Sequence, residues 1–134
     1  SELAAAQEDY PKGLSILKKA LEHSPTNHVL NVRYAELLMK ASQYPACEKV
    51  LQAHVKRHPS NAYVWYLLAE VHGLAGHIYE VHKARAEYFI LHGIYNKAEI
   101  QLKNALKLAG DNVRDKAEIE QRLYDVRLLQ EDIL

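Results

Sequence analysis

This sequence has a single cysteine, no net charge and no long apolar run, and each of these features excludes some classes of protein. Cys47 is the only cysteine among 134 residues, which excludes an internal disulfide and a zinc site built from several thiolates. The 17 basic and 17 acidic residues cancel, whereas nucleic acids and anionic lipids select proteins with a basic surplus. The longest apolar run, the short stretch around residues 63–69, is far below the roughly 18 residues that a membrane-spanning helix needs. We therefore expect neither a nucleic-acid partner nor a membrane span.

The motifs of a catalytic or cofactor site are missing as well. The five glycines are dispersed, so they form no Gly-rich phosphate loop, and the serines stand in no nucleophile-elbow context. A reactive thiol needs an electropositive, accessible site, and nothing in the sequence around Cys47 indicates one, so we expect a small buried side chain there. The chain is predicted to hold no catalytic residue and no cofactor.

Eight histidines raise the question of a metal site. His54 and His58 have the four-residue spacing of metal ligands on a helix, but Val55 stands where a metalloprotease helix carries its catalytic glutamate. A second group has a five-residue spacing that crosses an expected turn and does not place three rings on one helix face; it comprises His72, His77 and His82. Packing and surface roles are favoured for all of them, and no metal ligand is predicted.

Two segments of the chain align without gaps. Tyr10 and Tyr44, each followed by proline, are separated by the same length of sequence as Pro25 and Pro59. The second segment leads into a stripe of large and small apolar residues and then a turn glycine, formed by Trp65, Leu68, Ala69 and Gly76. This period and stripe resemble the tetratricopeptide repeat (TPR), whose unit is a pair of helices of about 34 residues. The resemblance implies an all-α superhelix of helical hairpins with a concave binding groove.

After Gly76 the pattern advances by half a period, which is the step from Gly76 to Gly93. We expect the helix between them to be the second helix of one hairpin and the first helix of the next. The sequence predicts about eight antiparallel helices, near residues 2–8, 10–23, 28–41, 44–57, 61–74, 78–92, 94–109 and 112–132. They would form one domain over residues 1–134, with a truncated repeat (1–27), repeats at 28–61 and 62–93, and half-period helices (94–134) that end in a cap helix.

The repeat also predicts which side chains are buried and which line the groove. The expected core contains Trp65, Leu68, Leu51, Leu17 and Leu102, and tyrosines at packing or turn positions join it, namely Tyr10, Tyr44, Tyr88 and Tyr95. The opposite helix faces would line a protein-binding groove with Val29, Val32, Glu36, Met39, Tyr63, Tyr66, Glu70, Glu80, Lys83 and Glu87. Tyr63 and Tyr66 stand out because tyrosine combines apolar bulk with a polar tip, which suits recognition.

Glutamate recurs at one groove position, as Glu36, Glu70 and Glu87. Carboxylates there would repel the C-terminal carboxylate of a peptide, so we expect no carboxylate clamp. The groove should instead prefer an extended or helical segment with aromatic or aliphatic anchors and some basic character. The alternative is that these glutamates form only a solvated polar stripe.

A more specific resemblance covers residues 58–106 and the closing segment 122–127. It is carried by the half-period step, by the run Ala84-Arg85-Ala86-Glu87-Tyr88 and by His58-Pro59, Trp65, Leu68-Ala69-Glu70, Gly76, Gly93, Ala98 and Leu102. The segment resembles the C-terminal repeat domain of periplasmic zinc metalloproteases of the BepA type, the beta-barrel assembly-enhancing proteases of Gram-negative bacteria. That family carries its His-Glu-x-x-His zinc site in a separate N-terminal domain, and nothing in this chain matches that motif.

The resemblance implies a non-catalytic, periplasmic interaction domain within a zinc metallopeptidase that acts in outer-membrane protein assembly and quality control. Its partners would be the protease domain of the parent protein, the outer-membrane assembly machinery or client proteins. The chain opens directly in helix-like sequence at residues 3–6, so we expect it to be part of a longer protein. The alternative is a stand-alone TPR adaptor in secretion or pilus assembly, which would lack an upstream His-Glu-x-x-His domain.

The absence of a metalloprotease helix leads to a prediction about metal content. Because Val55 replaces the required glutamate, the purified chain should contain no stoichiometric zinc and should not cleave casein. Elemental analysis and a casein assay check this. One tightly bound zinc per chain would contradict the prediction and the roles favoured for the histidines.

Overall fold

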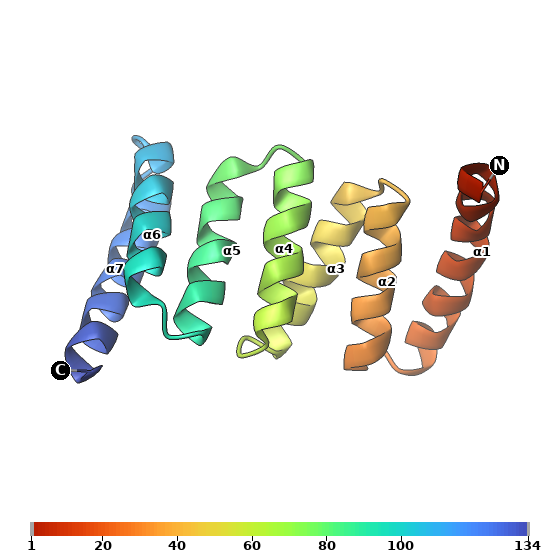
Figure 1. Ribbon diagram of the computed structural model, residues 1–134, viewed down its shortest axis with the longest axis horizontal. Helices are drawn as coiled ribbons and strands as arrows, with labels where there is room; N and C mark the ends of the chain where they lie inside the picture. Colours follow the sequence, from red (N-terminus) through yellow and green to blue (C-terminus); the bar gives the residue numbers. More distant parts are fainter. Residues whose placement is uncertain (1, 134) are drawn as a thin grey trace. The chain divides into compact units, whose positions relative to one another are not determined.

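The structure is a computed structural model that describes the backbone of residues 2–133 and the side chains of residues 9–132. Within this range the chain is entirely helical, which confirms the predicted all-α class of helical hairpins (Figure 1). Its helices are α1 (Glu2–His23), α2 (His28–Lys40), α3 (Tyr44–Arg57), α4 (Ala62–Leu74), α5 (Ile78–Leu91), α6 (Tyr95–Ala109) and α7 (Val113–Ile133). None of these helices is both long and apolar enough to cross a membrane.

The first helix differs from the prediction. Residues 2–8 and 10–23 were expected as two helices, but α1 runs from Glu2 to His23 without a break, with Pro11 inside it. Proline removes one hydrogen bond and strains the preceding turn, yet its fixed φ is compatible with helix. The helix therefore continues through Pro11, and the described part of the chain has seven helices where about eight were predicted. The other six agree with the predicted ranges to within one residue at each end.

Three inter-helix turns share one hydrogen-bonding geometry. The N–H groups of Gln43, His77 and Ile94 donate to the carbonyl oxygens of Leu38, His72 and Phe89 at 2.9, 2.8 and 2.9 Å. These bonds recur after one full repeat period and then after half a period, as the predicted half-period step requires. The turn residue before each donor has a positive φ, at Gly76, Gly93 and, without glycine, Ser42. This left-handed residue ends each helix and reverses the chain.

Asparagine caps mark the starts of the helices that follow longer turns. The side-chain oxygens of Asn27 and Asn61 accept from Leu30 N at 3.0 Å and from Val64 N at 3.2 Å. Asn112 does the same for Asp115 N at the start of α7, at 3.0 Å. Each cap satisfies an N–H group that has no partner within the helix. The caps on α2 and α4 are again one repeat period apart, so the repeat fixes helix starts as well as turns.

The helices group into two compact units, Ser1–Pro59 (unit 1) and Ser60–Leu134 (unit 2). In unit 1, α2 packs against both α1 and α3. Gly13 allows a close approach of α1, because a Cβ atom there would lie 2.8 Å from Leu37 Cδ2. The predicted Leu51 is fully buried and so is Cys47, whose Sγ atom donates to Ala35 O at 3.2 Å. Leu17, which was also predicted in the core, is only half-buried.

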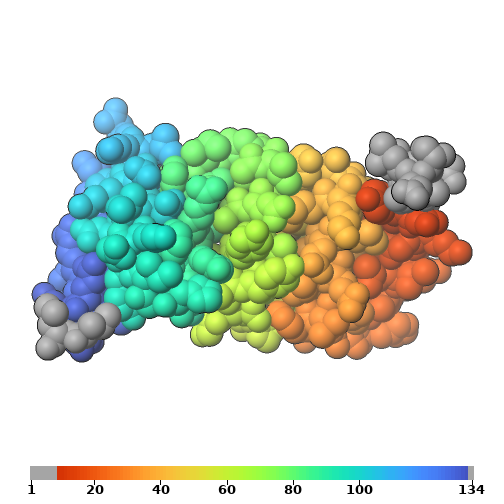
Figure 2. Space-filling view, viewed as in Figure 1, coloured from red at the N-terminus to blue at the C-terminus, as the bar shows by residue number. Residues whose placement is uncertain are grey.

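In unit 2, successive helices pack side by side, and α5 contacts α4 on one side and α6 on the other. This placement matches the expected role of α5 in two hairpins. The core that α6 and α7 share with α5 consists of Ala86, Ala98, Leu102, Ala105, Ile119, Leu123 and Val126. Leu68 is buried as predicted, whereas Trp65 is half-buried. In the space-filling view the side chains of α4, α5 and α6 (green to cyan) cover most of the gaps between their ribbons (Figure 2).

Two leucines on α6 give a matched test of this core. Leu102 is 1% exposed and Leu108 is 52% exposed. Leu102→Ala should lower the free energy of unfolding by about 2–5 kcal/mol because it leaves a cavity. Leu108→Ala should change it by less than about 0.5 kcal/mol. Urea unfolding followed by circular dichroism measures both, and equal losses would contradict the packing described.

Candidate protein-binding surface

The outer face of α4 carries two exposed tyrosines. Because the buried side of α4 holds Val64, Leu68 and Val71, the helical repeat turns Tyr63 and Tyr66 outward. Tyr63 is 46% exposed and Tyr66 is 52% exposed. Their rings lie nearly parallel, with an interplanar angle of 12° and centroids 6.2 Å apart. The two predicted recognition tyrosines are thus brought together on one face.

The aromatic surface continues onto α5. The ring centroid of Tyr66 lies 6.0 Å from that of Tyr88, and Tyr88 lies 4.5 Å from His92 at the C-terminal end of α5. We call Tyr63, Tyr66, Tyr88 and His92 the aromatic ladder. Sequence reasoning assigned Tyr88 to the core, but its ring is only half-buried and links α4 to the end of α5. The contact of Tyr88 with Tyr66 joins two helices, so it has no local signal in the sequence.

The charge beside the ladder is negative. Glu70 follows Tyr66 by one helical turn and therefore lies on the same face of α4. It is exposed, and among the described residues it makes no ion pair. This carboxylate remains available to a cationic group of a partner, at the edge of an apolar aromatic surface.

The predicted groove residues of α5 are engaged within unit 2, which differs from the expectation of an open face. Lys83 Nζ lies 2.7 Å from Glu118 Oε1 of α7 and 3.7 Å from Glu80 Oε2. Arg122 of α7 donates from Nε and Nη2 to the two carboxylate oxygens of Glu87, at 2.8 and 2.6 Å. Sequence reasoning missed these pairs because a helical period places residues on a face but does not say which helix covers that face.

The electrostatics of these pairs keeps both cations charged. The hydrogen bond and the charge of Glu87 raise the pKa of the Arg122 guanidinium above its ordinary range, against the effect of burial. Burial alone lowers the pKa of Lys83, but the hydrogen bond to Glu118 and the charge of Glu80 outweigh it, so that the pKa is raised. Both cations of α5 and α7 thus stay charged, and the carboxylate of Glu87 is paired with the guanidinium of Arg122.

In unit 1 the four predicted groove residues of α2 have different environments. Val29 is exposed, Glu36 and Met39 are half-buried, and Val32 is buried in the core. Val32 differs from the expectation because α2 packs against helices on two sides, which leaves it little outward surface. Val29 and parts of Glu36 and Met39 remain accessible on this helix.

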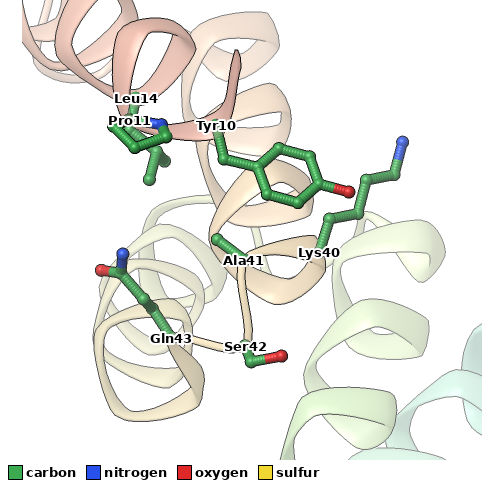
Figure 3. Close-up of a pocket in the computed structure, with 7 residues that line it drawn as sticks. All are labelled: Tyr10, Pro11, Leu14, Lys40, Ala41, Ser42 and Gln43. Atoms are coloured by element: carbon green, nitrogen blue, oxygen red, sulfur yellow. The ribbon is translucent and has the colours of Figure 1, made fainter. Parts of the chain in front are cut away.

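Unit 1 also has a surface pocket of about 290 Å³ beside the turn between α2 and α3. Tyr10, Pro11 and Leu14 of α1 line one side of it, and the residues facing them are Lys40, Ala41, Ser42 and Gln43 (Figure 3). Lys40 is the only charged group in this lining.

Comparison with known proteins fits this architecture. Residues 4–71, about half of the chain, match the family described as Tetratricopeptide repeat. The chain belongs to the TPR family, and its surfaces are those of a protein–protein interaction domain.

Individual relatives add detail. The chain is 30% identical over 102 residues to a Vibrio cholerae protein provisionally named as a beta-barrel assembly-enhancing protease; the match covers 76% of this chain and 20% of that protein. The chain thus spans about a fifth of the length of this relative. Two solved structures of MamA share the fold. One, titled as a double mutant, has a TM-score of 0.60 at 22% identity and covers 94% of this chain and 70% of its own. The other, from Desulfovibrio magneticus, has a TM-score of 0.59 at 19% identity, with 96% and 70% covered.

The link between α5 and α7 can be measured with a double-mutant cycle. Glu87→Gln and Arg122→Gln should show a coupling free energy of about 1 kcal/mol, because the ion pair is bidentate and partly shielded from water. The pair Glu99–Lys103 on α6, with its atoms 3.2 Å apart, is the control and should couple by about 0.3–0.5 kcal/mol. Thermal or urea unfolding gives both values. A coupling for Glu87–Arg122 no larger than the control would contradict this assignment.

Proposed function

We propose that this chain is the non-catalytic partner- or client-binding part of a larger bacterial protein of the beta-barrel assembly-enhancing protease type. Two observations support the proposal: the 30% identity to the Vibrio cholerae protein, and the resemblance of residues 58–106 to the repeat domain of that family. On this proposal the chain works in the periplasm, in the assembly and quality control of outer-membrane proteins, and the zinc site lies in another domain of the parent.

The main support for the proposed recognition surface is the exposed, stacked pair of Tyr63 and Tyr66, which Tyr88 extends. Large aromatic side chains are enriched at the energetic centres of protein interfaces, because they bury much area and lose little rotamer freedom. Exposure of two such rings on one helix face serves binding better than solubility. The ladder is therefore the proposed contact surface, ahead of the pocket beside Lys40.

The charges around the ladder indicate which kind of partner segment fits this surface. Glu70 would repel the terminal carboxylate of a peptide, and Lys83, which was the only cation expected in the groove, is held by Glu118. A carboxylate clamp is therefore not proposed. The partner that fits is an extended or helical protein segment with an aromatic or aliphatic anchor for the ladder and a Lys or Arg within reach of Glu70.

The test replaces both tyrosines by alanine. Tyr63→Ala/Tyr66→Ala should weaken binding to the purified outer-membrane assembly machinery, or to the protease domain of the parent, by about 2 kcal/mol or more. Calorimetric titration measures the affinity, and circular dichroism should show unchanged helicity because both rings lie outside the core. Tyr124→Ala provides the control, since Tyr124 is an exposed tyrosine of unit 2 on α7 and is absent from the ladder.

Two results would count against the proposal. If the double variant binds as tightly as wild type, the ladder is not the recognition surface. If Tyr124→Ala weakens binding by as much as the double variant does, the α7 face becomes the better candidate. Charge reversal of Glu70 should mainly change the association rate and its salt dependence.

A further inference from the structure

Three histidines meet in unit 1, where the start of α2 approaches the end of α3. The His28 Nδ1 and His54 Nε2 atoms are 2.8 Å apart, and the two rings are stacked with centroids 5.0 Å apart. The His58 ring lies 4.7 Å from that of His54 and 5.7 Å from that of His28. His54 is fully buried, His28 is half-buried and His58 is exposed. We call these residues the three-histidine cluster.

Neighbouring groups fix where the protons lie in this cluster. Arg57 Nη2 lies 3.2 Å from His54 Nδ1, and a guanidinium can only donate, so His54 Nδ1 must accept. A neutral His54 therefore carries its proton on Nε2 and donates to His28 Nδ1. Hence His28, when neutral, carries its own proton on Nε2. The tautomers of His54 and His28 thus follow from one bond to arginine.

This arrangement leaves no room for a further proton on either bonded nitrogen. A proton added to His54 Nδ1 would face the N–H group of Arg57, and one added to His28 Nδ1 would face the N–H group of His54. The charged and titratable groups that act on His54 are His28 from α2 and Arg57 and His58 from α3, and no carboxylate among the described residues contributes. None of these groups would therefore compensate a positive charge on His54.

We infer that the three-histidine cluster is an acid-sensitive latch that holds the start of α2 to the end of α3 at neutral pH and releases them on acidification. The latch lies beside Val29 and the accessible part of α2, so its opening would change that surface. The inference does not depend on the proposed partner or on the aromatic ladder, which belongs to unit 2.

The direction of the pH effect follows from His54. Burial, together with the charges of His28, His58 and Arg57, lowers the pKa of His54 from 6.5 to about 4. An opened hairpin exposes this ring, which then takes up a proton near pH 6.5. The open form therefore binds more protons between these two values, so the closed form has its full stability above about pH 6.5 and loses it as the pH falls toward 4.

Hydrogen exchange of the whole chain at pH 7.5 and 5.0, corrected for the intrinsic exchange rates, tests the latch. Opening of the start of α2 and the end of α3 should rise by about tenfold to thirtyfold at pH 5.0, as follows from the two pKa values of His54. Amides of α5 and α6 should change by less than about twofold. In parallel, NMR titration should give a midpoint for His54 well below 6.5.

Variants separate the latch from general acid sensitivity. His54→Gln keeps one donor and one acceptor but cannot titrate, so it should remove most of the pH-dependent opening. His23→Gln is the control, because His23 is an exposed histidine of unit 1 outside the cluster, and it should behave as wild type. If the Gln variant fails to fold, the wild-type chain still decides. A His54 midpoint at or above 6.5, or equal pH-dependent exchange in α2–α3 and α5–α6, would overturn the inference.

Discussion

One turn geometry sets how three pairs of successive helices are arranged, namely α2 with α3, α4 with α5 and α5 with α6. A backbone N–H group after the turn donates a hydrogen bond to a carbonyl oxygen in the last turn of the preceding helix. This bond requires a residue with left-handed backbone conformation between the two groups. Ser42, Gly76 and Gly93 supply it, and the same bonds recur after one repeat period and then after half a period. Because each turn reverses the chain sharply, neighbouring helices must pack along their lengths. That packing buries one face of each helix and leaves another for recognition.

The local signals in the sequence are the ones that predicted the fold. Turn residues such as Gly76 and caps such as Asn61 act over a few residues, so the all-α class and six helix ranges follow from the sequence. The predicted break between two helices near residue 9 was wrong, because α1 continues through Pro11. The half-burial of Trp65 was also not predicted, since burial depends on neighbours that a consensus stripe does not describe.

The candidate surface was predictable only where a single helix decides it. Tyr63 and Tyr66 lie on α4 alone, and their helical spacing placed them together. Contacts between helices could not be predicted from the sequence. Neither the contact of Tyr88 with Tyr66 nor the ion pair of Glu87 with Arg122, which are 35 residues apart in the sequence, has a local signal. The same holds for His28 and His54, whose rings stack across 26 residues. Side-chain chemistry between helices thus adds to the repeat both a candidate recognition surface and a titratable contact.

The central proposal is that this TPR domain binds its partner through the outward face of α4. Site-specific photo-crosslinking tests it most directly, with the same photoreactive amino acid placed at position 66 or at position 124 of the full-length protein in living cells. Both positions are exposed tyrosines of unit 2, so the two differ in location and not in accessibility. The account predicts that position 66 crosslinks to a subunit of the outer-membrane assembly machinery, to the parent's protease domain or to an outer-membrane client, and that position 124 does not. Crosslinks from position 124 alone, or equal crosslinks from both positions, would contradict it.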